Sequence, residues 1–259
     1  MKPVITKNIS VDPTHDEVPP AALGRKLRRA DDFIKIAVTA CDGLLHGDNT
    51  DIDATETGLF LGTAFGPMET NFEVLDLILE EGRSSPFLFS HSVFNAAAGY
   101  IAEIYNIKGC GQTITDFSWP FLLSLREGCS AINAGRLQRC LILQVETYSP
   151  LLEDSRQDLN PHSPAWPMGG VAWLLERSDR VSKGYQVDSL DINSRPAAPE
   201  AYLSRVAENR LNDIQLLAND PLSSARELTR YIEKNEPQKL EFCSNADYGT
   251  AKLLLHKTL

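Results

Sequence analysis

Residues 91–134 constrain the fold more than any other part of this chain, because they follow a helix–strand–turn–helix pattern. Apolar residues recur at helical spacing until two glycines break the pattern, and residues 112–115 are then rich in β-forming residues. Pro120 opens a second apolar-periodic helix, at a position where its missing N–H would have been unpaired anyway. The pattern therefore predicts a sharp turn at residues 116–119, directly before a helix N-terminus.

That turn is where an α/β enzyme would place a nucleophile. Unpaired N–H groups and the helix dipole favour an anion at a helix N-terminus. The turn contains Ser118 and no cysteine. A serine without a neighbouring base stays a neutral hydroxyl, so the turn by itself does not establish nucleophilic chemistry.

The rest of residues 24–195 alternates helices and strands, which predicts a layered α/β fold with a mixed sheet. Residues 1–23 are rich in proline and are expected to form an irregular arm or a short edge strand. Residues 147–167 are expected to form a loop or a flap over a site. Helices are expected at residues 29–45 and 69–81, and the second should turn Phe72, Leu75, Ile78 and Leu79 toward the core. Strands are expected at residues 58–66 and 139–145. A closing pair of strands, 169–176 and 186–193, should be joined by a turn at 182–184.

Beyond Arg195 the pattern changes. Apolar residues 203–214 mark an amphipathic helix, a shorter helix follows Pro221, and residues 239–244 are expected to form a strand. This tail is too short to form a second domain as large as the first.

Charge and cysteine content exclude several classes. The net charge of −10 and pI near 5.0 argue against a protein that binds nucleic acid through its phosphates. The five cysteines have no CxxC spacing and are expected to be reduced structural thiols. No apolar signal core or membrane-length run is present, so we expect a cytoplasmic protein with no membrane insertion.

Three segments together resemble one family: HSVFNAAAGYIA, the GCGQTIT strand and GGVAWLLERSD. They are similar to the amino-terminal half of β-ketoacyl synthases of the thiolase fold, and most similar to the chain-length-factor-like partners of aryl polyene and type II polyketide synthases. The resemblance runs from about residue 27 to residue 192. It implies a thiolase-like amino-terminal half at residues 1–195, largely complete, and a truncated remnant of the carboxy-terminal half at residues 196–259.

The residues that such a synthase uses for condensation are missing. The resemblance implies an acyl-accepting cysteine in the turn before the second helix, where Ser118 lies at or beside the cysteine's place. It also implies two histidines in the carboxy-terminal half. None of the five histidines has a matching context, and the nearest counterpart of the first histidine motif, residues 243–250, contains none. No cofactor is implied, and no residue spacing supports a metal site.

The leading hypothesis is therefore a non-catalytic, chain-length-factor-like subunit that forms a heterodimer with a full-length β-ketoacyl synthase. In such a pair the partner supplies the catalytic residues, and this chain shapes the far end of the polyene or polyketide tunnel. Acidic acyl carrier proteins would be repelled by this chain and would dock on the partner. The resemblance assigns the following residues to the dimer interface: Phe94, Asn95, Tyr100, Gly111, Gln112, Thr113, Ile114 and Thr115.

Phe117, Ser118 and Trp119 are the candidates to line the tunnel or pocket. Phe117 and Trp119 flank Ser118, and their bulky side chains could wall off the tunnel; core packing is an equal interpretation. One alternative function is a stand-alone acyltransferase, decarboxylase or hydrolase that uses Ser118. Another is a self-associating structural homologue without a tunnel.

Overall fold

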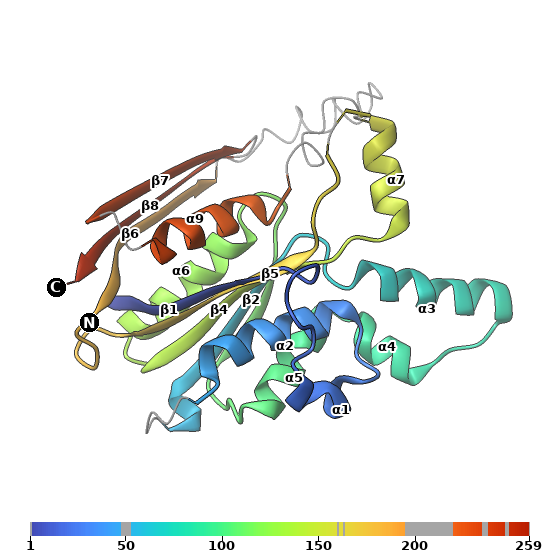
Figure 1. Ribbon diagram of the computed structural model, residues 1–259, viewed down its shortest axis with the longest axis horizontal. Coiled ribbons are helices and arrows are strands. Elements are labelled where there is room, and N and C mark those ends of the chain that lie inside the picture. The colour runs from blue at the N-terminus through green and yellow to red at the C-terminus, as the bar shows by residue number, and fades with distance from the viewer. Residues whose placement is uncertain are drawn as a thin grey trace.

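The computed structural model describes residues 2–47, 53–159, 161–162, 164–194, 220–234, 238–246 and 249–258, which form a layered α/β fold (Figure 1). The strands are β1 (Pro3–Val11), β2 (Thr57–Thr63), β3 (Gly111–Thr115), β4 (Arg139–Glu146), β5 (Gly169–Arg177), β6 (Gly184–Ser194), β7 (Lys239–Ala246) and β8 (Gly249–Thr258).

The helices are α1 (Gly24–Leu27), α2 (Asp32–Leu45), α3 (Met68–Glu81), α4 (Pro86–Ser92), α5 (Ala96–Ile104), α6 (Pro120–Asn133), α7 (Pro150–Leu159) and α9 (Ser223–Glu233), with short 3₁₀ turns at Ala21–Leu23 and Ala54–Glu56. Within the described ranges, no helix is both long and apolar enough to cross a membrane.

The strands form one mixed eight-stranded sheet in the order β3-β2-β4-β5-β1-β6-β8-β7. β2 runs parallel to β3 and β4, and the other neighbouring pairs are antiparallel. The expectation of a mixed sheet is confirmed. The carboxyl ends of the three parallel strands meet at one edge of the sheet, where α/β folds commonly place their sites.

Helices cover both faces of the sheet and divide its core in two. α2 and α5 pack on one face, around Leu59, Leu61 and Leu141. α6 and α9 pack on the other face and are covered in turn by β6, β8 and β7, which lie over them (Figure 1). The sheet can bend in this way because β1 pairs with β6 through only two residue pairs. The two helices α6 and α9 therefore lie between the two parts of one sheet.

The helix and strand predictions for the centre of the chain are confirmed. α2 begins where two aspartates precede the apolar pattern, and the Asp31 carboxylate accepts a hydrogen bond of 2.9 Å from Ile34 N as its N-cap. α6 begins at Pro120, and β4 is buried along nearly its whole length. The basic residues at positions 25, 26, 28 and 29 are exposed and lie in α1 and the turn after it.

The prediction for the amino terminus is wrong. Residues 3–11 form a central strand, β1, which lies between β5 and β6. The two closing strands are present as β5 and β6, but their pairing with each other is wrong, because β1 lies between them and pairs with both. The polar residues of β1 obscured its burial in the sequence: Lys7 Nζ donates to Leu44 O (2.9 Å), and Thr6 Oγ1 donates to Glu176 Oε2 (2.6 Å). These partners are distant in sequence.

The orientation predicted for residues 69–81 is also wrong. The segment is helical as expected, but Leu75, Ile78 and Leu79 are exposed. The buried residues of α3 are Thr70 and Val74, and Thr70 Oγ1 donates to Asp31 Oδ2 (2.8 Å). Helical periodicity identifies an apolar stripe, but it does not identify the surface that covers the stripe.

The segment expected to form a loop or flap contains a helix, α7. Ser149 precedes Pro150, and its Oγ accepts a hydrogen bond of 3.2 Å from Leu152 N. Glu153 lies four residues after this serine. A serine followed by proline and a nearby glutamate is a helix-start pattern that was available in the sequence.

In the tail, the helix after Pro221 and the strand near residue 239 are confirmed as α9 and β7. The helix expected at residues 203–214, and the boundary near Arg195, lie outside the described residues. Side chains alternate along β7, with Leu240 and Phe242 turned toward the core and Lys239 and Glu241 toward solvent. The tail thus adds strands to the same sheet, with a polar outer face.

Candidate functional site

The turn between β3 and α6 lies at the carboxyl end of the parallel strands. The Asp116 carboxylate oxygen Oδ1 accepts hydrogen bonds from Ser118 N (2.9 Å) and Trp119 N (2.6 Å). These bonds satisfy backbone donors at the start of α6, which the sequence places there through Pro120. Asp116 thereby supplies the negative charge that a helix N-terminus favours, so the turn is occupied by a residue of the chain itself.

The three residues of the predicted tunnel wall lie in different environments. Trp119 is only 2% exposed, and its Nε1–H donates to Ser244 Oγ of β7 (3.0 Å). Ser118 is half-buried, and Phe117 is 45% exposed at the surface beside β3. Trp119 therefore belongs to the core, and Phe117 is the residue of the three that a second protein can reach.

Little space lies behind the turn. The cavity beside Ser118 has a volume of about 10 Å³, room for roughly one water molecule. Trp119, Gln144, Pro221 and Leu228 are among the residues that line it. The described lining contains no histidine, cysteine or carboxylate, so the cavity offers Ser118 neither a base nor room for an acyl chain.

Gly62, on β2, allows helix α6 to approach the sheet closely. A Cβ at this position would overlap the backbone carbonyl of Pro120 and lie 2.9 Å from Ser124 Oγ. Because the obstacle is backbone at the first turn of α6, the helix start could not move aside without carrying the turn with it. The glycine near the end of β2 thus determines how closely the start of α6, and with it Ser118, lies to the sheet.

Glu146, at the end of β4, is a fully buried carboxylate next to this turn. Its oxygens accept four hydrogen bonds, from Ala64 N (2.7 Å), Gln144 Nε2 (2.9 Å), Thr63 Oγ1 (3.2 Å) and Phe65 N (3.3 Å). Burial raises the pKa of Glu146 from 4.5 to about 7, although these bonds oppose the rise. The carboxylate fastens the chain leaving β2 to the end of β4.

This raised pKa predicts a specific pH dependence of stability. Between pH 4.5 and about 7 the unfolded chain ionises Glu146 and the folded chain does not, so the folded state holds the extra proton and loses stability as pH rises. Since each pKa unit corresponds to ~1.36 kcal/mol, the loss is about 3 kcal/mol. Urea unfolding of the wild type and of Glu146→Gln at several pH values should show this difference, and parallel curves would contradict it.

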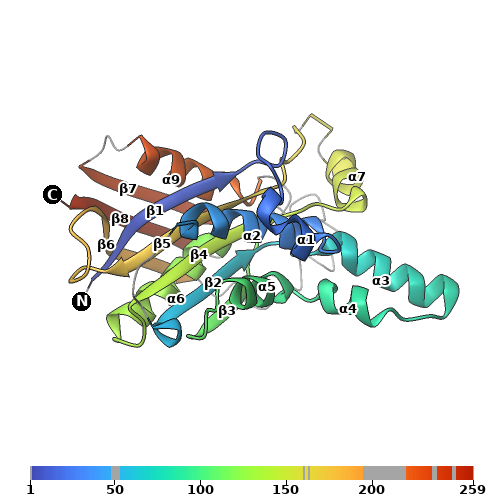
Figure 2. The same ribbon diagram turned by 60° about the horizontal axis from the view of Figure 1, so that its bottom comes forward.

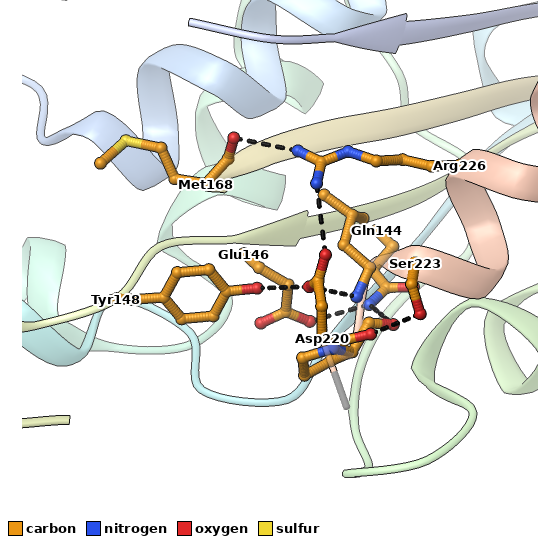
Figure 3. Close-up of polar contacts among 9 residues, drawn as sticks. Gln144, Glu146, Tyr148, Met168, Asp220, Ser223 and Arg226 are labelled. Carbon is orange, nitrogen blue, oxygen red and sulfur yellow. Dashed lines mark hydrogen bonds and ion pairs between the residues drawn. The ribbon is translucent and has the colours of Figure 1, made fainter. Parts of the chain in front are cut away.

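A second polar network joins the end of β4 to the start of α9 (Figure 3). Tyr148 Oη donates to Asp220 Oδ1 (2.9 Å), and Arg226 Nη1 lies 3.3 Å from Asp220 Oδ2. Arg226 Nη2 donates to Met168 O (3.0 Å). Gln144 connects the two networks, because its Nε2 donates both to Glu146 and to Pro221 O (3.0 Å). The start of α9 is therefore fastened over the space behind the turn.

Aromatic rings cover the outer side of this region. Phe65 makes edge-to-face contacts with Phe117 (ring centroids 5.6 Å apart) and Tyr148 (6.0 Å). Trp166 packs on Tyr148, and the guanidinium of buried Arg156 lies 5.5 Å from the Trp166 ring. Tyr148 and Trp166, from the segment expected to lie over a site, therefore pack against Phe65, which in turn contacts Phe117 of the turn.

The cysteines and histidines are scattered. Cys41, Cys129 and Cys140 are buried, which raises their pKa values and keeps their thiols protonated. His15, His46 and His162 are exposed, and His256 faces Asp188 on the outer sheet. In the described part of the chain, no group of three or more His, Cys, Asp and Glu residues could hold a metal ion.

The predicted interface residues share one side of the molecule. β3 is an edge strand that pairs only with β2 among the described strands, and Gly111 to Thr115 are exposed or half-buried. Phe94 and Asn95 are exposed at the start of α5. Tyr100 is half-buried, with its hydroxyl 2.9 Å from Nε2 of buried His91. Whether these residues contact another chain stays a prediction.

Sequence reasoning missed the two buried networks. Glu146 directly follows an apolar strand, and this position was a usable signal for a buried carboxylate. Nothing in the sequence indicated its contact with residues 63–65, or that of Tyr148 with Asp220, which lies 72 positions away.

Comparisons with known proteins identify the fold. No protein-family model matches the sequence, and no curated protein sequence matches it. Among solved structures, the ishigamide ketosynthase/chain length factor aligns with a TM-score of 0.75 at 17% identity, covering 100% of both chains. The ketosynthase ApeO in complex with its chain length factor ApeC from Xenorhabdus doucetiae aligns with a TM-score of 0.67 at 17% identity, covering 99% of both chains.

A third structure is a type II PKS acyl-carrier protein in complex with its ketosynthase bound to the hexaketide (AntDE:AntF). It aligns with a TM-score of 0.74 at 12% identity, covering 98% of this chain and 99% of that one. Together these alignments show the thiolase-like ketosynthase fold, which confirms the predicted fold class.

Proposed function

We propose that this chain is a non-catalytic, chain-length-factor-like subunit that pairs with a full-length β-ketoacyl synthase and shapes the far end of its acyl tunnel. The observation that carries the proposal is the closed turn at α6. The Asp116 carboxylate accepts hydrogen bonds from Ser118 N and Trp119 N directly before the helix, Ser118 lies at or beside the place of the family's cysteine, and the cavity beside Ser118 holds about one water molecule. An acyl-enzyme intermediate has neither a thiolate nor space here.

The exposed edge of β3 supports the pairing. One side of this strand has no neighbouring strand among the described elements, and an unpaired edge is a template for association with another chain. Two structures of the same fold are named as ketosynthases with a chain length factor. We infer that the β3 edge and α5 face the synthase, which supplies the catalytic cysteine and histidines.

The charge of the chain supports an indirect relation to the acyl carrier protein. At −10, its surface would repel an acidic carrier, and the structure named AntDE:AntF contains a carrier protein in complex with a ketosynthase. We infer that the carrier docks on the synthase partner.

The first test is condensation activity. The isolated chain, supplied with malonyl- and acyl-carrier protein, should form no condensed product above background. Adding a β-ketoacyl synthase from the same genome should give elongated products, measured by mass spectrometry of the carrier. Ser118→Ala should leave the rate of the pair unchanged. Condensation by the isolated chain, or labelling of Ser118 by a serine-directed acyl probe, would favour a stand-alone enzyme.

The second test concerns product length. Phe117 is exposed beside the proposed interface, whereas Trp119 is buried in the core. If the far end of the tunnel is closed by a bulky side chain from this subunit, Phe117→Ala should shift the pair toward longer acyl chains, with little change in the rate of the first condensation. An unchanged length distribution would exclude Phe117 as the steric limit.

A further inference from the structure

The hairpin of α3 and α4 extends away from the body of the molecule, and both views show the two helices side by side at one end (Figures 1 and 2). It exposes large apolar side chains. Seven of the ten large apolar residues exposed in the described chain lie between residues 75 and 117, and five of them belong to α3 and α4. The seven are Leu75, Ile78, Leu79, Phe87, Phe89, Phe94 and Phe117. Clustering of this kind marks interaction surfaces.

The exposed apolar stripe of α3 lies on a different face of the helix from its buried residues. Thr70 and Val74 are buried and recur at helical spacing on one side of α3, and Leu77 lines the groove between α3 and α4 together with Leu88. Leu75 and Leu79 lie on another side, and Leu79 is 79% exposed. α3 therefore has a second apolar face, beyond the one that holds it to α4, and water covers that face in the isolated chain.

A row of carboxylates borders this stripe. Glu69, Glu73, Asp76 and Glu80 follow one another at spacings of three and four residues, which places them on one face of α3. Glu73, Asp76 and Glu80 line the groove between α3 and α4. The hairpin from Met68 to Ser92 contains five carboxylates and one arginine. An apolar stripe with an acidic border requires an apolar partner surface with a basic border.

We propose that the α3–α4 hairpin is a docking arm that grips the ketosynthase partner, with the apolar stripe of α3 in an apolar groove and the acidic row against lysine and arginine side chains. This inference rests on the proposed pairing and adds a contact surface and a basis for partner choice. A second copy of this chain is excluded as the occupant, because it would set two acidic rows against each other. Two further exposed phenylalanines follow in the chain: Phe94, between α4 and α5, and Phe117, directly after β3.

The apolar contact is tested by binding of the full-length β-ketoacyl synthase from the same genome, measured by surface plasmon resonance. Leu75→Asp with Leu79→Asp should weaken binding by more than about 100-fold, because two central apolar contacts are lost and two charges are desolvated. The control is Tyr231→Asp, which alters a side chain on α9 with the same 49% exposure as Leu75. It should change binding by less than about threefold, and circular dichroism should be unchanged in both.

The charge contact has a matched control of equal net charge. Glu73→Gln, Asp76→Asn and Glu80→Gln together should weaken binding to the synthase about tenfold at low salt, flatten its salt dependence and increase self-association in sedimentation. Removing three exposed carboxylates elsewhere, by Glu227→Gln, Glu233→Gln and Glu241→Gln, should do none of these.

The outcomes separate the two proposals. If the wild type binds the synthase tightly and the Leu75 and Leu79 substitutions leave this binding unchanged, the docking arm is overturned and the pairing stays intact. Binding that depends on the leucines but is equal for both charge variants overturns the role of the acidic row. A wild-type chain that does not bind the synthase at all overturns the pairing, and the arm with it.

Discussion

Replacing Glu146 with alanine should lower the free energy of unfolding by about 3–5 kcal/mol near pH 5, one of the two largest effects that we expect from a single substitution in this chain. The carboxyl accepts hydrogen bonds from Ala64 N, Phe65 N and Gln144 Nε2, and it is completely buried. Alanine leaves the two backbone N–H groups without an acceptor, at a cost of ~1–3 kcal/mol each. Chemical denaturation followed by circular dichroism measures the change.

Glutamine at position 146 is the matched control. Its carbonyl oxygen can accept from Ala64 N and Gln144 Nε2, and its amide can donate to Thr63 Oγ1, so only the contact with Phe65 N is lost. We expect a cost of about 1–2 kcal/mol. The penalty of the alanine variant should shrink at pH 8, because the wild-type carboxylate is then ionised. Equal costs for alanine and glutamine would mean that the hydrogen bonds contribute nothing.

Replacing Trp173 with alanine should cost about 3–5 kcal/mol and loosen the tail from the body of the protein. The side chain of Trp173, on β5, is fully buried between α6 and α9. Its ring packs edge-to-face on Phe121, with centroids 4.7 Å apart, and its Nε1–H donates to Thr229 Oγ1 on α9 (2.8 Å). One side chain thus connects the sheet to both central helices.

Trp173→Phe separates packing from hydrogen bonding. It keeps most of the apolar volume and removes only the N–H donor, so a cost of about 1–2 kcal/mol is expected. Hydrogen exchange of α9 and β7 should increase in the alanine variant before that of β4 does. If alanine costs less than about 1 kcal/mol, the layer that contains α9 is not part of the cooperative core.

The two networks explain why the turn at α6 is closed. Glu146 fixes the ends of β2 and β4, and Asp220 fixes the start of α9 over Gln144. The cavity beside Ser118 is small because Trp119, Gln144 and the start of α9 close around it. Opening it for an acyl chain would leave buried polar groups unpaired, which supports our proposal that the partner carries out condensation.

Much of the fold could be predicted because its signals are local. Apolar periodicity, an aspartate before the first turn of α2 and a proline at the start of α6 place those helices within a few residues. The continuous apolar run in β4 indicates a strand covered on both faces. The turn at residues 116–119 follows from the elements on either side of it, so the location of the candidate site was available without coordinates.

Other features depend on partners that are far away in the sequence. β1 looks too polar to be a central strand until Lys7 and Thr6 find acceptors on α2 and β5. The apolar stripe of α3 predicts burial, yet Val74 turns inward and Leu79 outward, because α4 covers a different face. Glu146 acquires its raised pKa only from burial beside residues 63–65.

The sequence by itself determined which segments are helices and strands in the centre of the chain, and where the site turn lies, because backbone propensity and side-chain period act over a few residues. Only the tertiary structure decided which faces are covered, how β1 joins the sheet and why the space behind Ser118 is filled. Burial and hydrogen-bond partners are properties of neighbours in space, and a residue's neighbours in space are set by the whole packed chain.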